Sequence, residues 1–231
     1  MLARWRPVLA YTVVELAIPW LLLSRAEQHL SSSFSALMIA TVPLLGVLLA
    51  RATGGTEHIG RRRLLGLGLG LAGVATLVGA GSHGATPVTV GEELVVAMGY
   101  ATGPWIINRH LSDLPSLGVV AVSLTVTAVL YAPAGLVQRP SHVSGQVLAA
   151  VVVLALVCTA LAFLLFFDLI TEVGPSRATV ITYVNPAVAV LLGVVLLGES
   201  LTVGVLIGFP LILAGSVLAT GGAPGRAVAE P

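Results

Sequence analysis

The chain has 231 residues, of which 57% are hydrophobic and only 9% are charged, with a formal net charge of +1. Soluble domains carry about a quarter charged residues, so this composition excludes a soluble enzyme and a basic, nucleic-acid-binding domain. The mean hydropathy of +1.03 predicts instead that lipid surrounds most of the chain. The single cysteine, Cys158, lies in an apolar run, which leaves no disulfide or cysteine-based metal site within one chain.

Eight apolar runs are long enough to cross about 30 Å of hydrocarbon as helices, which takes about 20 residues. Strands of a membrane barrel would be about ten residues long with alternating polarity, whereas these runs are longer and apolar on all sides. The sequence therefore predicts an all-α fold, a polytopic membrane bundle of about eight transmembrane helices. In chain order, the predicted spans are Pro7–Leu23, Phe34–Ala50, Leu64–Ala80, Gly91–Ile107, Leu117–Val137, Val147–Leu169, Ala178–Leu197 and Leu201–Ala219.

The first predicted span carries an acidic residue, Glu15, in the middle of its apolar sequence. A charged group at the bilayer centre costs roughly 3 kcal/mol or more, so we expect Glu15 to face a cavity or a partner helix. Glu15 is either a site for a substrate cation or a proton, or a structural hydrogen bond between helices. Pro19 is expected to bend this helix, and Trp20 either lines a cavity or anchors the chain at the membrane interface.

Prolines also lie inside the second and seventh predicted spans, at Pro43 and Pro186. Each frees a backbone carbonyl and allows a bend, which suits either a carrier that changes its access or a simple adjustment of helix shape. Tyr183 and Asn185 precede Pro186 and are candidates to line a cavity. Because an amide in hydrocarbon needs a partner, Asn185 either contacts a substrate or links helices.

The fourth predicted span contains two further cavity candidates, Tyr100 and Trp105. We expect Gly103-Pro104 to break the helical phase between them. Aromatic walls would suit amphiphilic or aromatic solutes, although Trp105 also fits an interfacial aromatic belt. Glu92 and Glu93 are expected to begin this helix, where negative charge interacts favourably with the helix dipole.

Two other patterns concern packing and chemistry. Gly66 and Gly70, like Gly204 and Gly208, form small-xxx-small pairs that let helices approach closely. No two of the five histidines have metal-ligand spacing on a helix, and no Ser/His/Asp arrangement is supported. The sequence therefore predicts no metal site, no cofactor and no enzymatic activity.

The arginines predict the orientation of the chain. With the N-terminus in the cytoplasm, nine of the eleven fall on the cytoplasmic side, and only Arg25 and Arg139 fall outside. An even number of spans also brings the C-terminus, with Arg226, to the cytoplasm. We therefore predict a multi-pass protein of the plasma (inner) membrane with both termini cytoplasmic and a disordered cytoplasmic tail at residues 222–231.

Two stretches of the chain resemble each other. The matched pairs are Pro43 with Pro186 at an offset of 143, and Glu57 with Glu199, Gly66 with Gly208 and Gly73 with Gly215 at an offset of 142. In the predicted topology the two copies have opposite orientations, which makes them an inverted repeat. Two mirror-related halves can expose one shared site to either side of a membrane in turn.

This doubled pattern resembles the EamA-type transporters of the drug/metabolite transporter superfamily. The resemblance is best in GPSRATVITYVNPAVAVLLGVVLLGESLTVGVLIGFPLILAGSVL, from Gly174 to Leu218, and it recurs in SSSFSALMIATVPLLGVLLAR followed by RRRLLGLGLGLAGVATL. The family pattern is a small residue at a helix start, a mid-helix Pro, a Gly-Glu before the next helix, then Gly and Ala-Gly. Here it corresponds to Ala178, Pro186, Gly198-Glu199, Gly208 and Ala214-Gly215.

Members of this family usually have ten helices in two five-helix repeats. The resemblance therefore implies a partial, three-helix first repeat at residues 1–87 that lacks the first two family helices, and a five-helix second repeat at residues 88–221. A miscalled start or a gene fragment is the expected explanation. The alternative is a genuinely shorter protein that assembles as an oligomer, with a homodimer as the candidate.

The resemblance also implies a function. We expect a secondary transporter that moves a small metabolite or amphiphilic solute across the plasma membrane by alternating access, with export as the expected direction. The expected partners are the lipid bilayer and a small-molecule substrate. The alternative is a membrane assembly subunit that does not transport.

Overall fold

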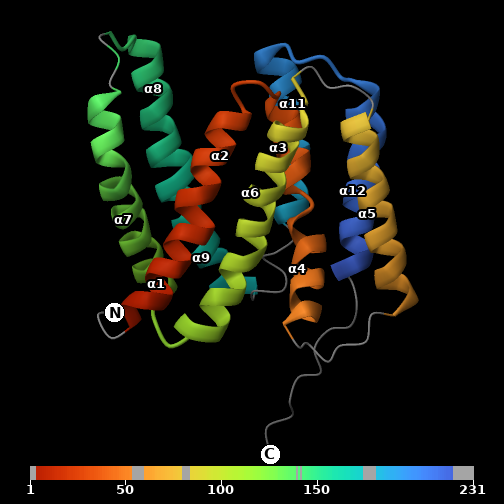
Figure 1. Ribbon diagram of the computed structural model, residues 1–231, viewed down its shortest axis with the longest axis horizontal. Coiled ribbons are helices and arrows are strands. Elements are labelled where there is room, and N and C mark those ends of the chain that lie inside the picture. Colours follow the sequence, from red (N-terminus) through yellow and green to blue (C-terminus); the bar gives the residue numbers. More distant parts are fainter. Residues whose placement is uncertain are drawn as a thin grey trace, which may run out of the picture. The chain divides into compact units, whose positions relative to one another are not determined.

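The computed structural model describes residues 4–53, 60–79, 84–138, 140, 142–173 and 181–220. Over these residues the chain is helical and contains no strand, so the predicted all-α fold is confirmed (Figure 1). Glu57, Arg177, Ala178 and the predicted tail lie outside this part. The described elements are α1 (Trp5–Tyr11), η2 (Thr12–Ala17), α2 (Ile18–Ala26), α3 (Ser32–Ile39), α4 (Val42–Ala52), α5 (Arg61–Gly79), α6 (Pro87–Ile106), η3 (Ile107–Leu111), α7 (Ser116–Val137), α8 (Gly145–Val153), η4 (Leu154–Leu161), α9 (Ala162–Val173), α11 (Ile181–Leu197) and α12 (Val203–Thr220).

Within the described residues, each predicted span corresponds to one helix or to successive helices, and the second span comprises α3 and α4 with a two-residue turn between them. The elements α1, η2 and α2 follow one another without a break, as do α8, η4 and α9, because η2 and η4 are π-helical stretches inside longer helices. Among the described residues, five helices are long and apolar enough to cross a membrane: Trp5–Ala26, Ser32–Ala52, Arg61–Gly79, Ser116–Val137 and Gly145–Phe166. Two shorter apolar helices cover Val184–Leu197 and Val203–Ala219.

The chain divides into two compact units. Unit 1 comprises Met1–Ala17 and Ile106–Ile181, and unit 2 comprises Ile18–Trp105 and Thr182–Pro231. Each unit takes helices from both predicted repeats, since the units reflect contacts and the repeats reflect sequence similarity. The repeat boundaries at residues 87 and 88 therefore stay predictions.

In unit 1, α1 and η2 pack against α7, and α7 also contacts α9. The hydroxyl of Tyr131 in α7 donates a hydrogen bond to the carbonyl oxygen of Ala17 at the end of η2. No residue of α8 or η4 is buried. This exposed apolar surface fits a chain whose outer face meets lipid.

In unit 2, the core lies between α3, α5 and α12 and includes the fully buried side chains of Phe34, Leu37 and Ile212. The closest approach is between α5 and α12, and it depends on glycine. A Cβ atom added at Gly66 would lie 2.5 Å from the backbone nitrogen of Ala219, and one at Gly215 would lie 2.4 Å from that of Gly70. The predicted close packing at Gly66 and Gly70 is therefore confirmed.

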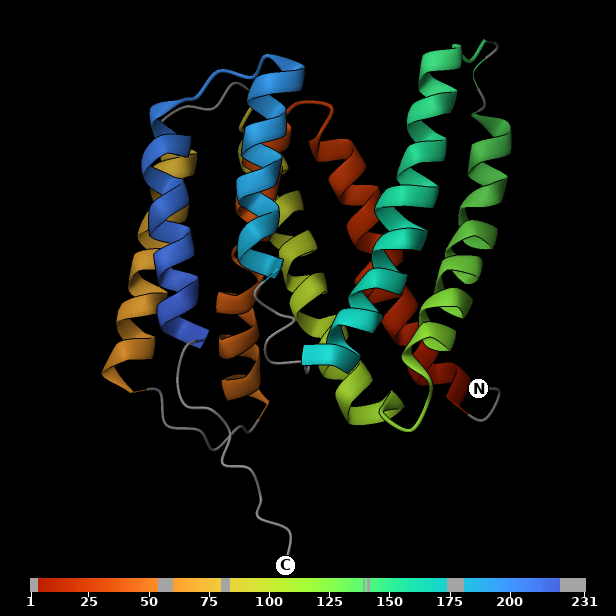
Figure 2. The same cartoon turned by 180° about the vertical axis from the view of Figure 1, so that it is seen from behind.

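The helices matched in the sequence repeat run in opposite directions within unit 2. From its N-terminal end, α4 runs downward in Figure 2, whereas α11 runs upward. Likewise, α5 runs upward and α12 downward (Figures 1 and 2). Opposite directions are what an inverted repeat requires.

The second span is interrupted directly before Pro43. Ala40 and Thr41 separate α3 from α4, and Pro43 lies in the first turn of α4, where its missing N–H leaves no bond unmade. The N–H of Leu44 bonds to Thr41 at 2.9 Å, so the carbonyl of Ala40 is free to accept from the Ser216 hydroxyl of α12 at 3.1 Å. By contrast, α2 and α11 continue through Pro19 and Pro186, and both of these side chains are buried.

Candidate functional site

At one end of unit 2, α2 and α11 end and α3, α6 and α12 begin (Figure 1). Four glutamates lie at or near these helix ends in the sequence. Glu27 follows α2, Glu92 and Glu93 lie in α6, and Glu199 lies between α11 and α12. Glu27 is close enough to interact electrostatically with both Glu93 and Glu199. We refer to these four residues as the carboxylate cluster.

Within the cluster, Glu199 caps the N-terminus of α3. Its carboxylate accepts hydrogen bonds from the backbone N–H groups of Ser32 at 2.8 Å and Ser33 at 3.1 Å, and from the Ser33 hydroxyl at 2.5 Å. The first N–H groups of a helix have no partner inside the helix, and the helix dipole favours negative charge there. Glu199 therefore joins the α11–α12 connection to the start of α3, 166 residues earlier in the chain.

The local backbone places Glu199 for this role. Gly198 ends α11 with a φ of +66°, a conformation that glycine adopts readily. The N–H of Glu199 then donates to the Gly193 carbonyl at 3.0 Å. A Cβ atom at Gly193 would lie 2.5 Å from the Glu199 carboxylate and 2.8 Å from the Ser33 hydroxyl, so only glycine leaves room for the cap.

The two loop glutamates have opposite pKa shifts. Burial alone would raise the pKa of Glu199, but the hydrogen bonds from Ser33 and Ser32 outweigh it and lower this pKa below its usual value. The pKa of Glu27 is raised, first by burial and then by repulsion from the Glu199 carboxylate. The cap therefore keeps Glu199 ionised, while its neighbour Glu27 holds a proton more readily than an isolated glutamate.

Glu93 is the most buried member of the cluster, with no exposed surface. Its Oε1 accepts a hydrogen bond from the Ser35 hydroxyl of α3 at 2.6 Å. Within the described residues, its Oε2 is buried and has no hydrogen-bond partner. The expected role of Glu93 at the start of its helix is wrong, because α6 begins at Pro87 and its first turn contains no acidic residue.

An open cavity of about 400 Å³ lies beside the cluster, between the end of α2 and the start of α6. Arg25 and Glu92, which line it, form an ion pair at 3.2 Å. The Glu92 side chain is 13% exposed and that of Arg25 is 62% exposed. The complete lining is Arg25, Gln28, His29, Gly84, Thr86, Val88, Thr89 and Glu92.

The cavity residues predicted from the sequence lie on several elements. Trp20 in α2 and Tyr100 and Trp105 in α6 are half-buried and belong to unit 2. Asn185 in α11 also belongs to unit 2 and is exposed, and the side chain of Tyr183 lies outside the described part of the structure. The expected break at Gly103-Pro104 is wrong, because α6 stays helical through both residues and the π-helical turn η3 follows later.

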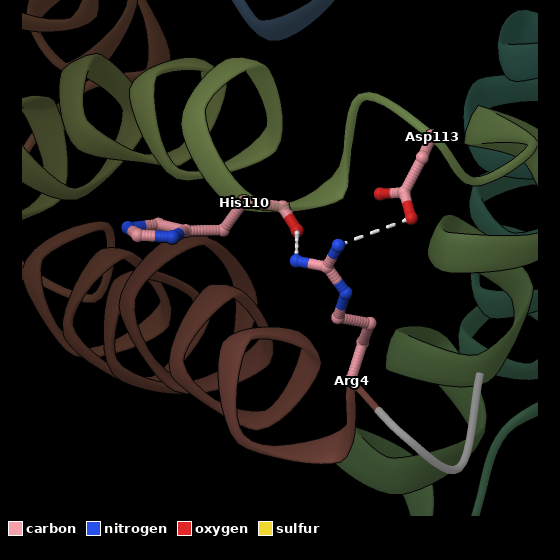
Figure 3. Close-up of polar contacts among 3 residues, drawn as sticks. All are labelled: Arg4, His110 and Asp113. Carbon is pink, nitrogen blue, oxygen red and sulfur yellow. Dashed lines mark hydrogen bonds and ion pairs between the residues drawn. The ribbon is translucent and has the colours of Figure 1, made fainter.

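Glu15 lies in unit 1, in the π-helical stretch η2, and its side chain is half-buried. Such stretches are frequent at functional sites because they shift side chains out of the regular helical register. The same unit contains a polar contact near the start of α1. The Arg4 guanidinium donates to the His110 carbonyl at 3.2 Å and pairs with Asp113 at 3.3 Å (Figure 3). Because Arg4 and Asp113 are both about half exposed, this pair contributes little to stability.

The partners of Glu93 and Glu199 were not predicted from the sequence. One available signal was the run Ser31-Ser32-Ser33 directly before an apolar helix, whose first N–H groups need an acceptor. The other was the position of Glu93, directly before the apolar run LVVAMGY. Among the described residues, no group of three or more His, Cys, Asp or Glu side chains is placed to hold a metal ion.

Comparison with known proteins matches most of the chain to one family. The model of the EamA-like transporter family matches residues 1–79 and 93–221. The uncharacterized inner membrane transporter YedA of Escherichia coli (strain K12) is 33% identical over 188 residues, covering 76% of this chain and 58% of YedA. The uncharacterized transporter YvbV of Bacillus subtilis (strain 168) is 26% identical over 185 residues, covering 78% of this chain and 60% of YvbV.

The fold also has a counterpart among solved structures. One crystal structure matches with a TM-score of 0.63 and 25% sequence identity, over 92% of this chain and 75% of the other. This chain spans only about three fifths of the length of the two curated transporters.

Proposed function

Because the chain belongs to the EamA-like transporter family, we propose that it is a secondary transporter that exports a small metabolite or amphiphilic solute by alternating access. Membership of this family supports a multi-pass membrane protein. The transport activity, its direction, the alternating access and the small-molecule substrate are the parts that we propose, since this chain spans about three fifths of the length of the curated transporters.

The opposite directions of the matched helices carry this proposal. The pair α4 and α5 and the pair α11 and α12 follow the same sequence pattern in opposite senses (Figure 2). Such related halves can exchange conformations, so a site closed on one side becomes open on the other. The interruption before Pro43, which is absent at Pro186, gives the two halves different shapes in one state.

We assign the predicted cavity residues to substrate contact. Glu15 would balance the charge of a cationic group, because acidic side chains within membrane spans mark substrate and ion pathways. Trp20, Tyr100, Trp105 and Tyr183 would supply aromatic surface, and Asn185 a hydrogen bond. The helix bends that accompany a change of access would occur at Pro19, Pro43 and Pro186.

The membrane orientation and assembly belong to the same proposal. The arginine distribution supports cytoplasmic termini. We also propose that the protein forms a homodimer, and chemical cross-linking in native membranes tests this assembly. A dimer band would support this assembly, and a monomer across cross-linker lengths would oppose it.

Counterflow in proteoliposomes tests transport directly. Vesicles containing the full chain are loaded with an unlabelled solute, and uptake of the labelled form is followed, with ethidium and a panel of radiolabelled small metabolites as probes. We expect at least one probe to exchange, and Glu15→Gln to reduce that exchange at least tenfold. Exchange no faster than in empty vesicles for every probe would count against a transporter and favour the assembly subunit.

A further inference from the structure

We propose that Glu93 is a proton-binding site and carries the coupling proton of the transporter. This inference rests on the proposed transport function and names the ion that drives it. The step is the binding of one proton to the Glu93 carboxylate, which gives a neutral carboxylic acid, and its later release to water. No other bond forms or breaks.

The surroundings of Glu93 favour the protonated form. A buried ion needs a counter-ion or several hydrogen-bond donors, and without them burial costs several kcal/mol. Glu93 is fully buried, and the described residues give it one donor, the Ser35 hydroxyl at 2.6 Å. Its second oxygen has no hydrogen-bond partner there. A structural carboxylate in the ionised form would need more donors than this site supplies.

The charges around Glu93 act in the same direction. Glu92 on the same helix and Glu27 after α2 are both acidic, and both interact with Glu93. The nearby cation, Arg25 at the end of α2, is paired with Glu92. Glu199 is held ionised by its bonds to α3 and adds to the negative charge next to Glu27. From α3, the polar group that meets Glu93 is the uncharged Ser35.

The cavity beside the cluster offers the proton a route to water. Thr89 lines this cavity and lies four residues before Glu93, so the two side chains share one face of α6. They are separated by about 6 Å along the helix axis, since each residue adds about 1.5 Å. His29 and Glu92 also line this cavity, so polar side chains lead from its opening toward the carboxylate cluster. A small shift of α6 or α3 would therefore let water from this cavity reach the Glu93 carboxylate, which is fully buried in this structure.

Infrared difference spectroscopy tests proton binding without any transported solute. The full chain in liposomes is titrated from about pH 8 to about pH 5, a range that buried carboxyl groups can reach. We expect a carboxylic-acid carbonyl band in the wild type, its loss in Glu93→Gln and its retention in Asp113→Asn, which removes an exposed carboxylate. Ser35→Ala removes the one donor, so the same band should persist to higher pH. An acid band unchanged in Glu93→Gln, or absent from the wild type across the range, would overturn the proposal.

Transport then tests coupling. With a probe that the wild type carries, Glu93→Gln should abolish accumulation driven by a pH gradient, at least tenfold, yet retain counterflow exchange at equal pH. Full pH-driven accumulation by Glu93→Gln would overturn the proposal. If the wild type carries no probe, the transporter assignment fails, but the infrared result still decides whether Glu93 binds a proton.

Discussion

Single side chains determine how one end of unit 2 is held together. Glu199 accepts three hydrogen bonds from two serines at the start of α3, and these bonds lower its pKa. A lowered pKa stabilises the fold above the usual pKa of glutamate, and that stabilisation is lost as the pH falls through the folded-state value. The cap should therefore be intact at neutral pH and weaken in acid.

Glu199→Gln should lower stability by about 1–3 kcal/mol at neutral pH, because charge-assisted hydrogen bonds are replaced by weaker ones. Below about pH 4 the wild type loses the stabilisation from the ionised carboxylate. The melting temperature of the variant should therefore fall less than that of the wild type as the pH is lowered. Thermal unfolding in detergent, followed at several pH values, measures both effects. Glu172→Gln, at an exposed position in α9, is the control and should behave as the wild type. Equal melting temperatures for Glu199→Gln and the wild type would contradict the assigned cap.

Gly193→Ala should lower the melting temperature nearly as much as Glu199→Gln does. The added methyl group would lie 2.5 Å from the Glu199 carboxylate, so the cap has to move. Gly68→Ala in α5 is the matched control, since no atom lies within 4 Å of its added Cβ. Alanine favours a helix by up to about 1 kcal/mol over glycine, so the control should melt at the same or a higher temperature. A rise in melting temperature for Gly193→Ala would refute the steric argument.

These residue-level contacts were only partly predictable. The Gly198-Glu199 pattern identified Glu199 as a notable position, but not its partners at Ser32 and Ser33, because no local rule links residues so far apart in the sequence. Glu93 was misplaced because the helix was expected to start near Gly91. The structure extends α6 back to Pro87, which moves Glu93 into the second turn and the interior.

At the level of elements, glycine decides how α5 and α12 pack. The spacing of Gly66 and Gly70 predicted a close helix contact, and the structure identifies α12 as the partner. Sequence could predict the stripe because its period is that of a helix. It could not identify the partner, since several apolar helices carry small residues.

Gly66→Val should destabilise the protein by about 1–3 kcal/mol or prevent its folding, because a side chain there collides with the backbone of α12. Gly68→Val lies two residues away on the open side of α5 and adds the same side chain. Comparing the two variants by thermal unfolding and by yield of folded protein therefore separates packing from helix propensity. A similar loss of stability in both variants would show that the lower helix propensity of valine, and not the collision with α12, causes the loss.

At the scale of the whole molecule, apolar length was a sufficient guide to the helices. All eight predicted spans correspond to helices in the structure. The division into two units was not predicted, because it depends on contacts between α1 and α7 and between α5 and α12 that periodicity does not encode.

The predicted membrane orientation leads to a labelling experiment. In a Cys158→Ala background, Ser200→Cys between α11 and α12 should react with a membrane-impermeant maleimide added to intact spheroplasts. Ser112→Cys between η3 and α7 should react only after permeabilisation. Both positions are exposed, so access to the reagent decides the outcome. Labelling of Ser112→Cys in intact spheroplasts, with labelling of Ser200→Cys only after permeabilisation, would place both termini outside the cytoplasm.

The glycine contact between α5 and α12 also has a mechanical consequence. Helices separated by side chains can slide by about 1–2 Å as rotamers readjust. At Gly66, Gly70 and Gly215 main-chain atoms meet directly, and no rotamer is available to absorb such a slide. These two helices, one from each matched segment, should therefore travel together as a stiff pair, and any rocking between access states has to occur at other joints of the bundle.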